Sequence, residues 1–151
     1  MNDAPHTTPA MARYTLGIDL GTTHCALSWV DTAASDGDKV VQGVLQIPQL
    51  TGPGATEDRA LLPSFLYLPH ASELAPGDLT LPWTAAQDFA VGEFARTRGA
   101  ATPIRLVSSA KSWLCHPGVD RRAAILPAEA PPEVAPVAPR AASERILAPL
   151  P

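Results

Sequence analysis

The chain has few of the residues that mark membrane, secreted or nucleic-acid-binding proteins. Of its 151 residues, 17% are charged, 5% are aromatic and two are cysteines. Cys25 and Cys115 lack the spacing of a metal or redox motif, so we expect both to be reduced packing residues in a cytoplasmic protein. No apolar run reaches the roughly 18 residues of a membrane span. No basic patch favours nucleic acid, and the first residues lack the apolar core of a signal peptide.

Proline is the residue in surplus, with 17 in the chain. Many of them lie in the stretch "LPAEAPPEVAPVAP", which excludes a regular helix or a central strand there. We therefore predict a disordered leader at 1–12, a proline-rich loop at 126–141, and at 142–151 a helix that begins near Ser143 and is cut short by two prolines. Because so short a helix is not stable alone, we expect the chain to be a truncated piece of a larger domain.

Alternating apolar and polar residues predict two strands near the N-terminus, at 13–19 and 24–31, with a tight turn between them. A third predicted strand, at 40–47, follows a turn rich in Asp and Gly, so this part of the chain predicts an antiparallel meander. The later predicted elements are a loop at 48–60, a short strand at 61–69, an irregular insert at 70–83, a helical pattern at 85–101 broken near Gly92, and a helix from the Thr102 N-cap and Pro103 to about Cys115.

The turn between the first two strands has the composition of a phosphate-binding loop. Gly21 lets an anion approach the backbone closely, and successive N–H groups in such a turn form an anion-binding concavity. The hydroxyls of Thr22 and Thr23 add donors for phosphate oxygens. Asp19, at the end of the first strand, would hold a divalent cation through water, as magnesium prefers. The alternative is an ordinary hairpin turn, although consecutive threonines are poor in one.

Lys111 is a second candidate for binding a phosphate. In the predicted helix it lies along the apolar stripe of Ile104, Val107 and Leu114, so it would reach into a cleft. The alternative is a lysine that extends along the rim of a core. The histidines have no metal-ligand spacing, and the three tryptophans, Trp29, Trp83 and Trp113, are expected to be core residues.

Four ordered segments resemble one known family. "GIDLGTT" (17–23) is similar to the first phosphate loop of the actin-like ATPases, and most of all to that of the seventy-kilodalton heat-shock chaperones. "LPSFLYL" (62–68), "VGEFA" (91–95) and "SSAKSWL" (108–114) resemble, in the same order, a short strand, a helix start and the segment of the catalytic lysine in that family. Sugar kinases of the same superfamily share a loop like the first segment but lack the later three.

The resemblance implies an α/β fold of the RNase H-like, actin-like ATPase type, represented in part. Residues 13–125 would supply the first meander of one lobe and a small inserted subdomain of the nucleotide-binding domain. Asp19 would orient water around Mg²⁺, and Thr22 and Thr23 would contact the phosphates of ATP. Lys111 would stabilise charge at the γ-phosphate, which is the usual basis of phosphoryl transfer.

The sequence also departs from the family pattern. His24 and Cys25 stand where Asn-Ser is common, Leu62 replaces a Thr, and Ser112 replaces an Arg, which is typical of a divergent bacterial branch. The second lobe and the peptide-binding domain have no counterpart here. We therefore expect little or no ATP hydrolysis by this chain alone, and unfolded client peptides and co-chaperones would bind only a full-length form. The alternatives are a non-catalytic truncated product and another actin-fold protein such as a sugar kinase.

Overall fold

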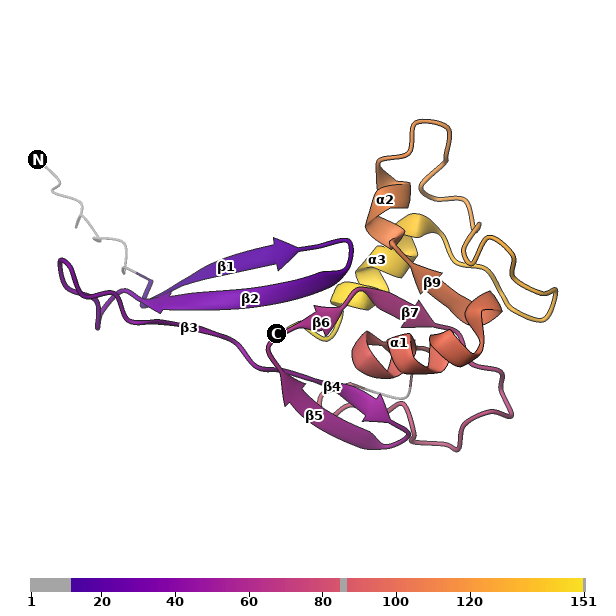
Figure 1. The fold of residues 1–151 in the computed structure, drawn as a ribbon, viewed down its shortest axis with the longest axis horizontal. Coiled ribbons are helices and arrows are strands. Elements are labelled where there is room, and N and C mark those ends of the chain that lie inside the picture. Colours follow the sequence, from indigo (N-terminus) through magenta and orange to yellow (C-terminus); the bar gives the residue numbers. More distant parts are fainter. Residues whose placement is uncertain (1–11, 85–86, 151) are drawn as a thin grey trace, which may run out of the picture.

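An antiparallel ribbon forms the first part of the fold. The structure, a computed structural model, describes residues 12–84 and 87–150 (Figure 1), so almost all of the predicted leader lies outside the described residues. Strands β1 (Tyr14–Leu20) and β2 (His24–Asp31) pair along their whole length. Strand β3 (Gln42–Val44) pairs with Ser28 to Val30, in the second half of β2. The predicted meander is confirmed, although the third strand is shorter than the predicted 40–47.

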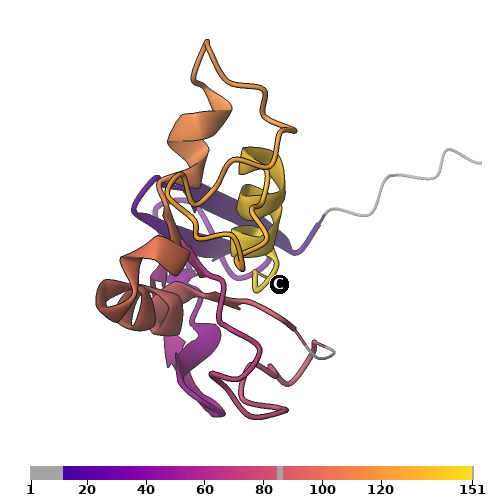
Figure 2. The ribbon, with the colours of Figure 1, turned by 90° about the vertical axis from the view of Figure 1, so that its right-hand side faces the viewer.

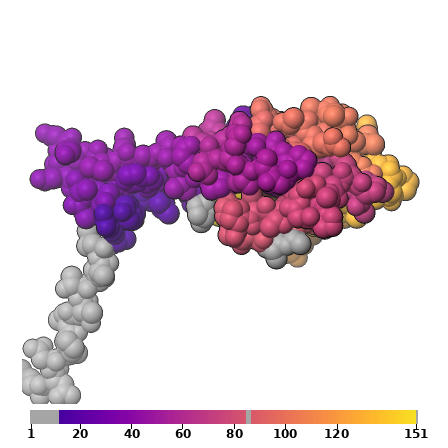
Figure 3. Space-filling model, turned by 90° about the horizontal axis from the view of Figure 1, so that it is seen from below, coloured from indigo at the N-terminus to yellow at the C-terminus, as the bar shows by residue number. Residues whose placement is uncertain are grey.

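The ribbon projects away from the helices, and it buries little of β1. Figures 1 and 3 show it extending to one side of the molecule. All seven residues of β1 are exposed, and the side chains of Leu16 and Ile18 are 64% and 60% exposed. The other edge of β2 has a partner at its base, where β6 (Leu62–Pro63) pairs with His24 and Cys25. The ribbon is thus joined to the rest of the fold mainly through β2.

A buried carboxylate closes the far end of the ribbon. Asp31 is 6% exposed and accepts hydrogen bonds from the Arg13 side chain (3.1 Å) and from the N–H groups of Ala33 and Ala34. Burial raises the pKa of Asp31, but these hydrogen bonds outweigh it, and the pKa lies below its ordinary value. The carboxylate of Asp31 therefore holds the turn after β2 through hydrogen bonds.

Residues 48–60, predicted to be a loop, form a hairpin instead. Strand β4 (Ile47–Gly52) pairs with β5 (Ala55–Arg59) in a sheet of two strands. The prolines and glycines suggested a loop, but an edge strand tolerates Pro48 because one side of it needs no ladder hydrogen bond. Gly54 makes the turn with a φ of +64°. The prediction was wrong because it weighed turn residues above the residues that are buried in this segment, Gln49 and Leu50.

A second small sheet carries the longest helix. Strand β7 (Phe65–Tyr67) pairs antiparallel with β8 (Ala90–Val91) and β9 (Leu106–Ser108). The predicted strand at 61–69 is therefore divided into β6 and β7. Helix α1 (Gly92–Ala101) begins at the glycine where the helical pattern was expected to break. Of that pattern, residues 85–86 lie outside the described residues.

The predicted helix from Pro103 to Cys115 is wrong. The segment contains a 3-10 turn, η1 (Pro103–Arg105), then β9, then the short helix α2 (Ala110–Leu114). Val107 pairs with Leu66 on β7 and is 1% exposed, so sheet pairing overrides the helical pattern. Ser109 adopts a left-handed φ of 54°, which separates strand from helix. The apolar stripe expected to carry Lys111 does not exist.

The proline-rich stretch is followed by an earlier helix than predicted. Helix α3 (Pro139–Leu147) begins within the predicted loop 126–141, with proline at its first position. Ser143 does not cap it, because its hydroxyl donates to the Pro139 carbonyl one turn back. Before it, Leu126 and Val137 form a single bridge. Figure 2 shows α3 and the loop before it lying beside the rest of the fold.

Most of the core lies under the sheet of β7, β8 and β9, and a smaller group of Cys25, Ile47 and Leu62 lies at the base of the ribbon. One group of buried residues joins β7 and β9 to α2, α3 and the proline-rich stretch, and another joins β7 to α1 and β4. Cys25 is buried as expected, whereas Cys115 is exposed and Trp83 is 48% exposed, so their predicted packing roles are wrong. No helix within residues 12–84 and 87–150 is both long and apolar enough to cross a membrane.

Candidate functional site

The candidate phosphate loop lies at the base of the ribbon, where β1 turns into β2. Gly21 is required there, because a Cβ atom would lie 2.1 Å from the carbonyl oxygen of His24. Thr22 and Thr23 follow it and are exposed, as is Asp19 two residues before it. The loop therefore accepts only glycine at position 21 and leaves Thr22 and Thr23 accessible to a ligand.

Ser64 holds this loop from a distant part of the chain. Its hydroxyl donates to the Gly21 carbonyl (2.9 Å), and its N–H donates to the Thr23 carbonyl (2.8 Å). Cys25 lies beside them, with its sulfur 3.5 Å from the Ser64 hydroxyl. The serine is 5% exposed, so these contacts are shielded from water. Sequence reasoning placed Ser64 in a resembling segment but gave it no contact with the loop.

Lys111 reaches the same loop from α2. Its Nζ donates a hydrogen bond to the carbonyl oxygen of Leu20, the residue just before Gly21. The ammonium group is exposed and free to offer its other protons. Although its helix differs from the predicted one, the structure does bring Lys111 together with the end of β1, 91 residues earlier in the chain.

Asp19 lies on the same face of the ribbon as Gly17 of β1 and Ser28 of β2, which are opposite each other. A hollow of about 300 Å³ covers this face, lined in part by Gly17, Asp19, Ser28 and Val44. Among the described residues, no group of three or more His, Cys, Asp or Glu side chains is placed to hold a metal. A magnesium ion at Asp19 would therefore take its other ligands from water and phosphate oxygens, which is how magnesium commonly binds.

Protein-family models, curated proteins and solved structures give no match to this chain. The functional argument therefore rests on the residues themselves and on where the fold places them.

A larger cavity than the hollow at Asp19 lies elsewhere in the described residues. It measures about 690 Å³ and is lined by loop 68–80, by 133–137 and by two arginines. Arg105 donates to the carbonyl of Leu68 (3.3 Å), and the Arg145 guanidinium lies 4.8 Å above the Phe89 ring. None of the sequence-predicted site residues lines this cavity. Its guanidinium groups already have partners, so it is a weaker candidate for binding an anion than the loop.

Gln49 is a buried polar residue that sequence reasoning missed. It is 1% exposed, its Nε2 donates to the Leu61 carbonyl (2.9 Å), and its Oε1 accepts from the N–H of Glu93 (3.0 Å). Gly92, with a φ of +75°, leaves room for it, since a Cβ there would lie 2.7 Å from Oε1. Gln49 thus connects β4 to the segment before β6 and to the start of α1. The only signal was a glutamine between apolar residues in a segment taken for a loop.

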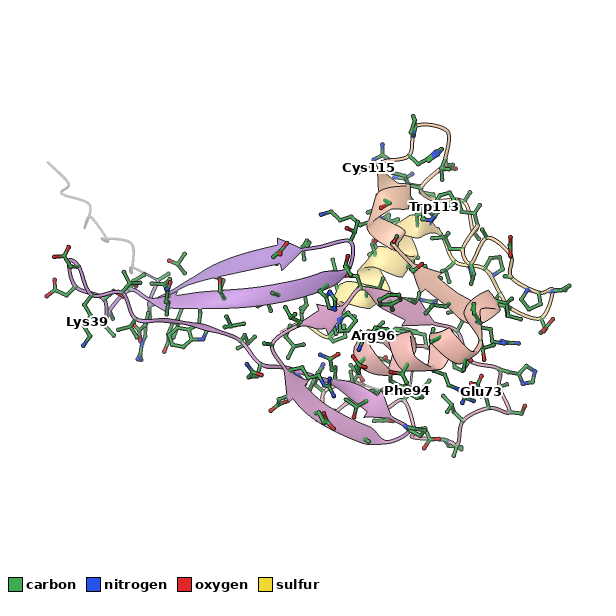
Figure 4. The ribbon with its side chains drawn as sticks, in the orientation of Figure 1. Lys39, Glu73, Phe94, Arg96, Trp113 and Cys115 are labelled. Carbon is green, nitrogen blue, oxygen red and sulfur yellow. The ribbon has the colours of Figure 1, made fainter. Side chains whose placement is uncertain are left out.

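A carboxylate beneath α1 was also missed. Glu73 accepts from the Tyr67 hydroxyl (2.8 Å), from the N–H of His70 (3.1 Å) and from Nε of Arg98 (2.5 Å). Figure 4 shows Glu73 beside the end of α1. Burial raises its pKa, but the hydrogen bonds from Arg98 and the other donors outweigh burial, so the pKa of Glu73 is below its usual value. Its donors fully occupy it, which makes it a structural residue.

Proposed function

We propose that this chain is part of the nucleotide-binding domain of an ATP-dependent chaperone of the seventy-kilodalton heat-shock type. In this proposal Gly21, Thr22 and Thr23 bind the phosphates of ATP, Asp19 holds Mg²⁺ through water, and Lys111 pairs with the terminal phosphate. The observation that carries the proposal is the contact between Lys111 and the carbonyl of Leu20. It brings a cation to a glycine-threonine turn that also lies next to a carboxylate.

The side chains of this cluster are better suited to binding a phosphate than those of an ordinary hairpin turn. A lysine is a point charge that suits a phosphate oxygen, and the turn offers hydroxyls and N–H groups as further donors. Ser64 fixes the loop by binding two of its carbonyl groups, so the loop is ordered before any ligand arrives. Preorganised donors of this kind are what stabilise developing charge in phosphoryl transfer. A cytoplasmic location belongs to the same proposal.

The proposal is tested by amide NMR spectra of the chain titrated with Mg²⁺-ATP and, separately, with Mg²⁺-tripolyphosphate. We expect the amide signals of 21–23 to shift in both titrations, because the proposed contacts are to phosphates. Lys111→Ala should weaken these shifts. Lys39→Ala is the matched control, since Lys39 lies at the far end of the ribbon (Figure 4) and should leave the titration unchanged. Equal titrations for both lysine variants would contradict the assignment of Lys111.

The proposal includes the expectation that this chain alone turns over little ATP, because the active site of that family is assembled from two lobes and the resemblance covers part of one. Magnesium-dependent hydrolysis by the purified chain, abolished by Lys111→Ala, would overturn that expectation. The same titration addresses the sugar-kinase alternative. A chaperone and a sugar kinase would both show the shifts with tripolyphosphate, but added sugars should change no signal if the chaperone assignment holds.

A further inference from the structure

One residue between β9 and α2 has a backbone conformation that its side chain disfavours. Ser109 has a φ of 54° and a ψ of 33°, in the left-handed region. Within residues 12–84 and 87–150 it is the single non-glycine residue with a positive φ. The left-handed region is unfavourable for a residue with a side chain, because its Cβ atom comes too close to a backbone carbonyl. Such a conformation persists only where the surrounding structure imposes it.

Ordinary helix capping does not account for this conformation. Ser109 is the N-cap residue of α2, and an N-cap residue normally has an extended backbone and accepts a hydrogen bond with its side chain. Ser109 has a left-handed backbone instead, and its exposed side chain makes no capping hydrogen bond. Its carbonyl accepts from the N–H of Ser112 (2.9 Å), as any residue could provide. The left-handed backbone is therefore not a by-product of capping.

The residues on both sides of Ser109 are fixed by the fold. Val107 pairs with β7 and is 1% exposed. Ala110, the first residue of α2, is 2% exposed and belongs to the same group of buried residues. The chain must therefore change from strand to helix within the two residues between them. Because Ser108 is still paired as part of β9, the change of direction occurs at Ser109.

The direction of α2 decides where the side chain of Lys111 lies. Lys111 comes two residues after Ser109, and its Nζ donates to the carbonyl of Leu20, beside the candidate phosphate loop. Figure 1 shows α2 next to the turn that joins β1 to β2. With an extended backbone at Ser109, α2 would leave β9 in a different direction. Either Lys111 would then lose its contact with the loop, or Ala110 would lose its burial.

We propose that Ser109 is a positioning residue for Lys111, because its left-handed backbone aims α2 so that the lysine reaches the phosphate loop. Ser109 itself touches no phosphate and acts only through the lysine. This inference rests on the proposed function, since the position of Lys111 affects binding only if Lys111 binds a phosphate. Any residue that tolerates the left-handed region should serve at position 109. Glycine and asparagine tolerate it, whereas β-branched residues do not.

Substitutions that differ in their tolerance of the left-handed region test the proposal. The dissociation constant for Mg²⁺-tripolyphosphate, measured from the amide signals of 21–23, should not change in Ser109→Gly or Ser109→Asn. In Ser109→Val it should rise roughly tenfold or more, the loss expected when a hydrogen bond to a charged group is removed. Ser108→Val is the matched control, because Ser108 is also exposed but lies in a strand, where valine is favoured. Equal constants for the two valine variants would overturn the proposal.

Two further variants separate positioning from a general effect on the fold. Ser109→Thr keeps the hydroxyl but is β-branched, so it should weaken binding in the same direction as valine and serves in its place if Ser109→Val does not fold. Ser109→Val combined with Lys111→Ala should bind tripolyphosphate no more weakly than Lys111→Ala alone, because Ser109 acts through the lysine. Normal binding by Ser109→Thr, or a further loss in the double variant, would contradict the positioning role.

A measurement without ligand distinguishes this inference from the proposed function. In the ligand-free chain, nuclear Overhauser contacts between the Lys111 side chain and Leu20 should be present in the wild type and in Ser109→Gly, and absent in Ser109→Val. If these contacts follow this order but tripolyphosphate shifts no wild-type signal, the proposed function is wrong while the positioning of Lys111 by Ser109 is supported. Contacts that persist in Ser109→Val would overturn the positioning role itself.

Discussion

Replacing Gln49 by Met should be among the most destabilising single changes in this protein. Gln49 is 1% exposed and makes two partly buried hydrogen bonds, to the carbonyl of Leu61 and from the N–H of Glu93. Methionine matches its length but offers neither group. Each of the two backbone groups left without a partner costs about 1–3 kcal/mol when it is buried, so the free energy of unfolding should fall by about 2–6 kcal/mol. The total free energy of unfolding of a native protein is about 5–15 kcal/mol.

The assay is urea unfolding followed by tryptophan fluorescence. With a slope of about 1–3 kcal/mol per molar urea, the expected loss moves the midpoint by about 0.7 M or more. Gln46→Met is the matched control, because Gln46 is exposed and three residues away, and its midpoint should not move. A midpoint shift for Gln49→Met no larger than that of the control would refute the reasoning, since the two hydrogen bonds would then contribute nothing.

Two further predictions concern a glycine and a carboxylate. Gly92→Ala should destabilise by more than Gly37→Ala in thermal melts: both have positive φ, worth about 1–2 kcal/mol to any other residue, but only at Gly92 does the added Cβ meet Gln49 and Leu62; equal losses would exclude a steric contribution. Because the folded pKa of Glu73 is lowered, its stabilisation is complete above the unfolded value of about 4.3 and is lost as pH falls through the folded value. The stability difference between wild type and Glu73→Gln should therefore be constant near neutrality and shrink in acid, and a difference that grew in acid would contradict this sign.

The strands of the ribbon could be predicted because their signals are local. Alternation of apolar and polar residues with a glycine turn predicts β1 and β2 without knowledge of the rest of the chain, and the structure has both. The helix predicted from Pro103 failed for the opposite reason. Its pattern was locally helical, but Val107 pairs with Leu66, forty-one residues earlier, and a single-sequence pattern contains no information about that neighbour.

In the candidate site, too, the residues with a local sequence signal could be predicted and those that depend on distant partners could not. Composition indicated Asp19, Gly21, Thr22 and Thr23, because a turn needs few residues to be recognised. Lys111 was chosen on a helical stripe that is absent, yet it lies at the loop. The buried supports, Ser64 and Gln49, gave almost no signal, since a polar residue among apolar ones predicts burial only when its hydrogen-bond partners are known.

The buried Asp31 has a consequence for how the ribbon opens. The two ends of the ribbon are held differently. The Asp31 carboxylate closes the far end, whereas β6 and Ser64 hold the base. Local opening should therefore start at the far end and move toward the base, so amide hydrogen exchange in β2 should be fastest near Val30 and slowest near Cys25. Acid that protonates Asp31 would steepen this gradient, because it removes the closure at one end only.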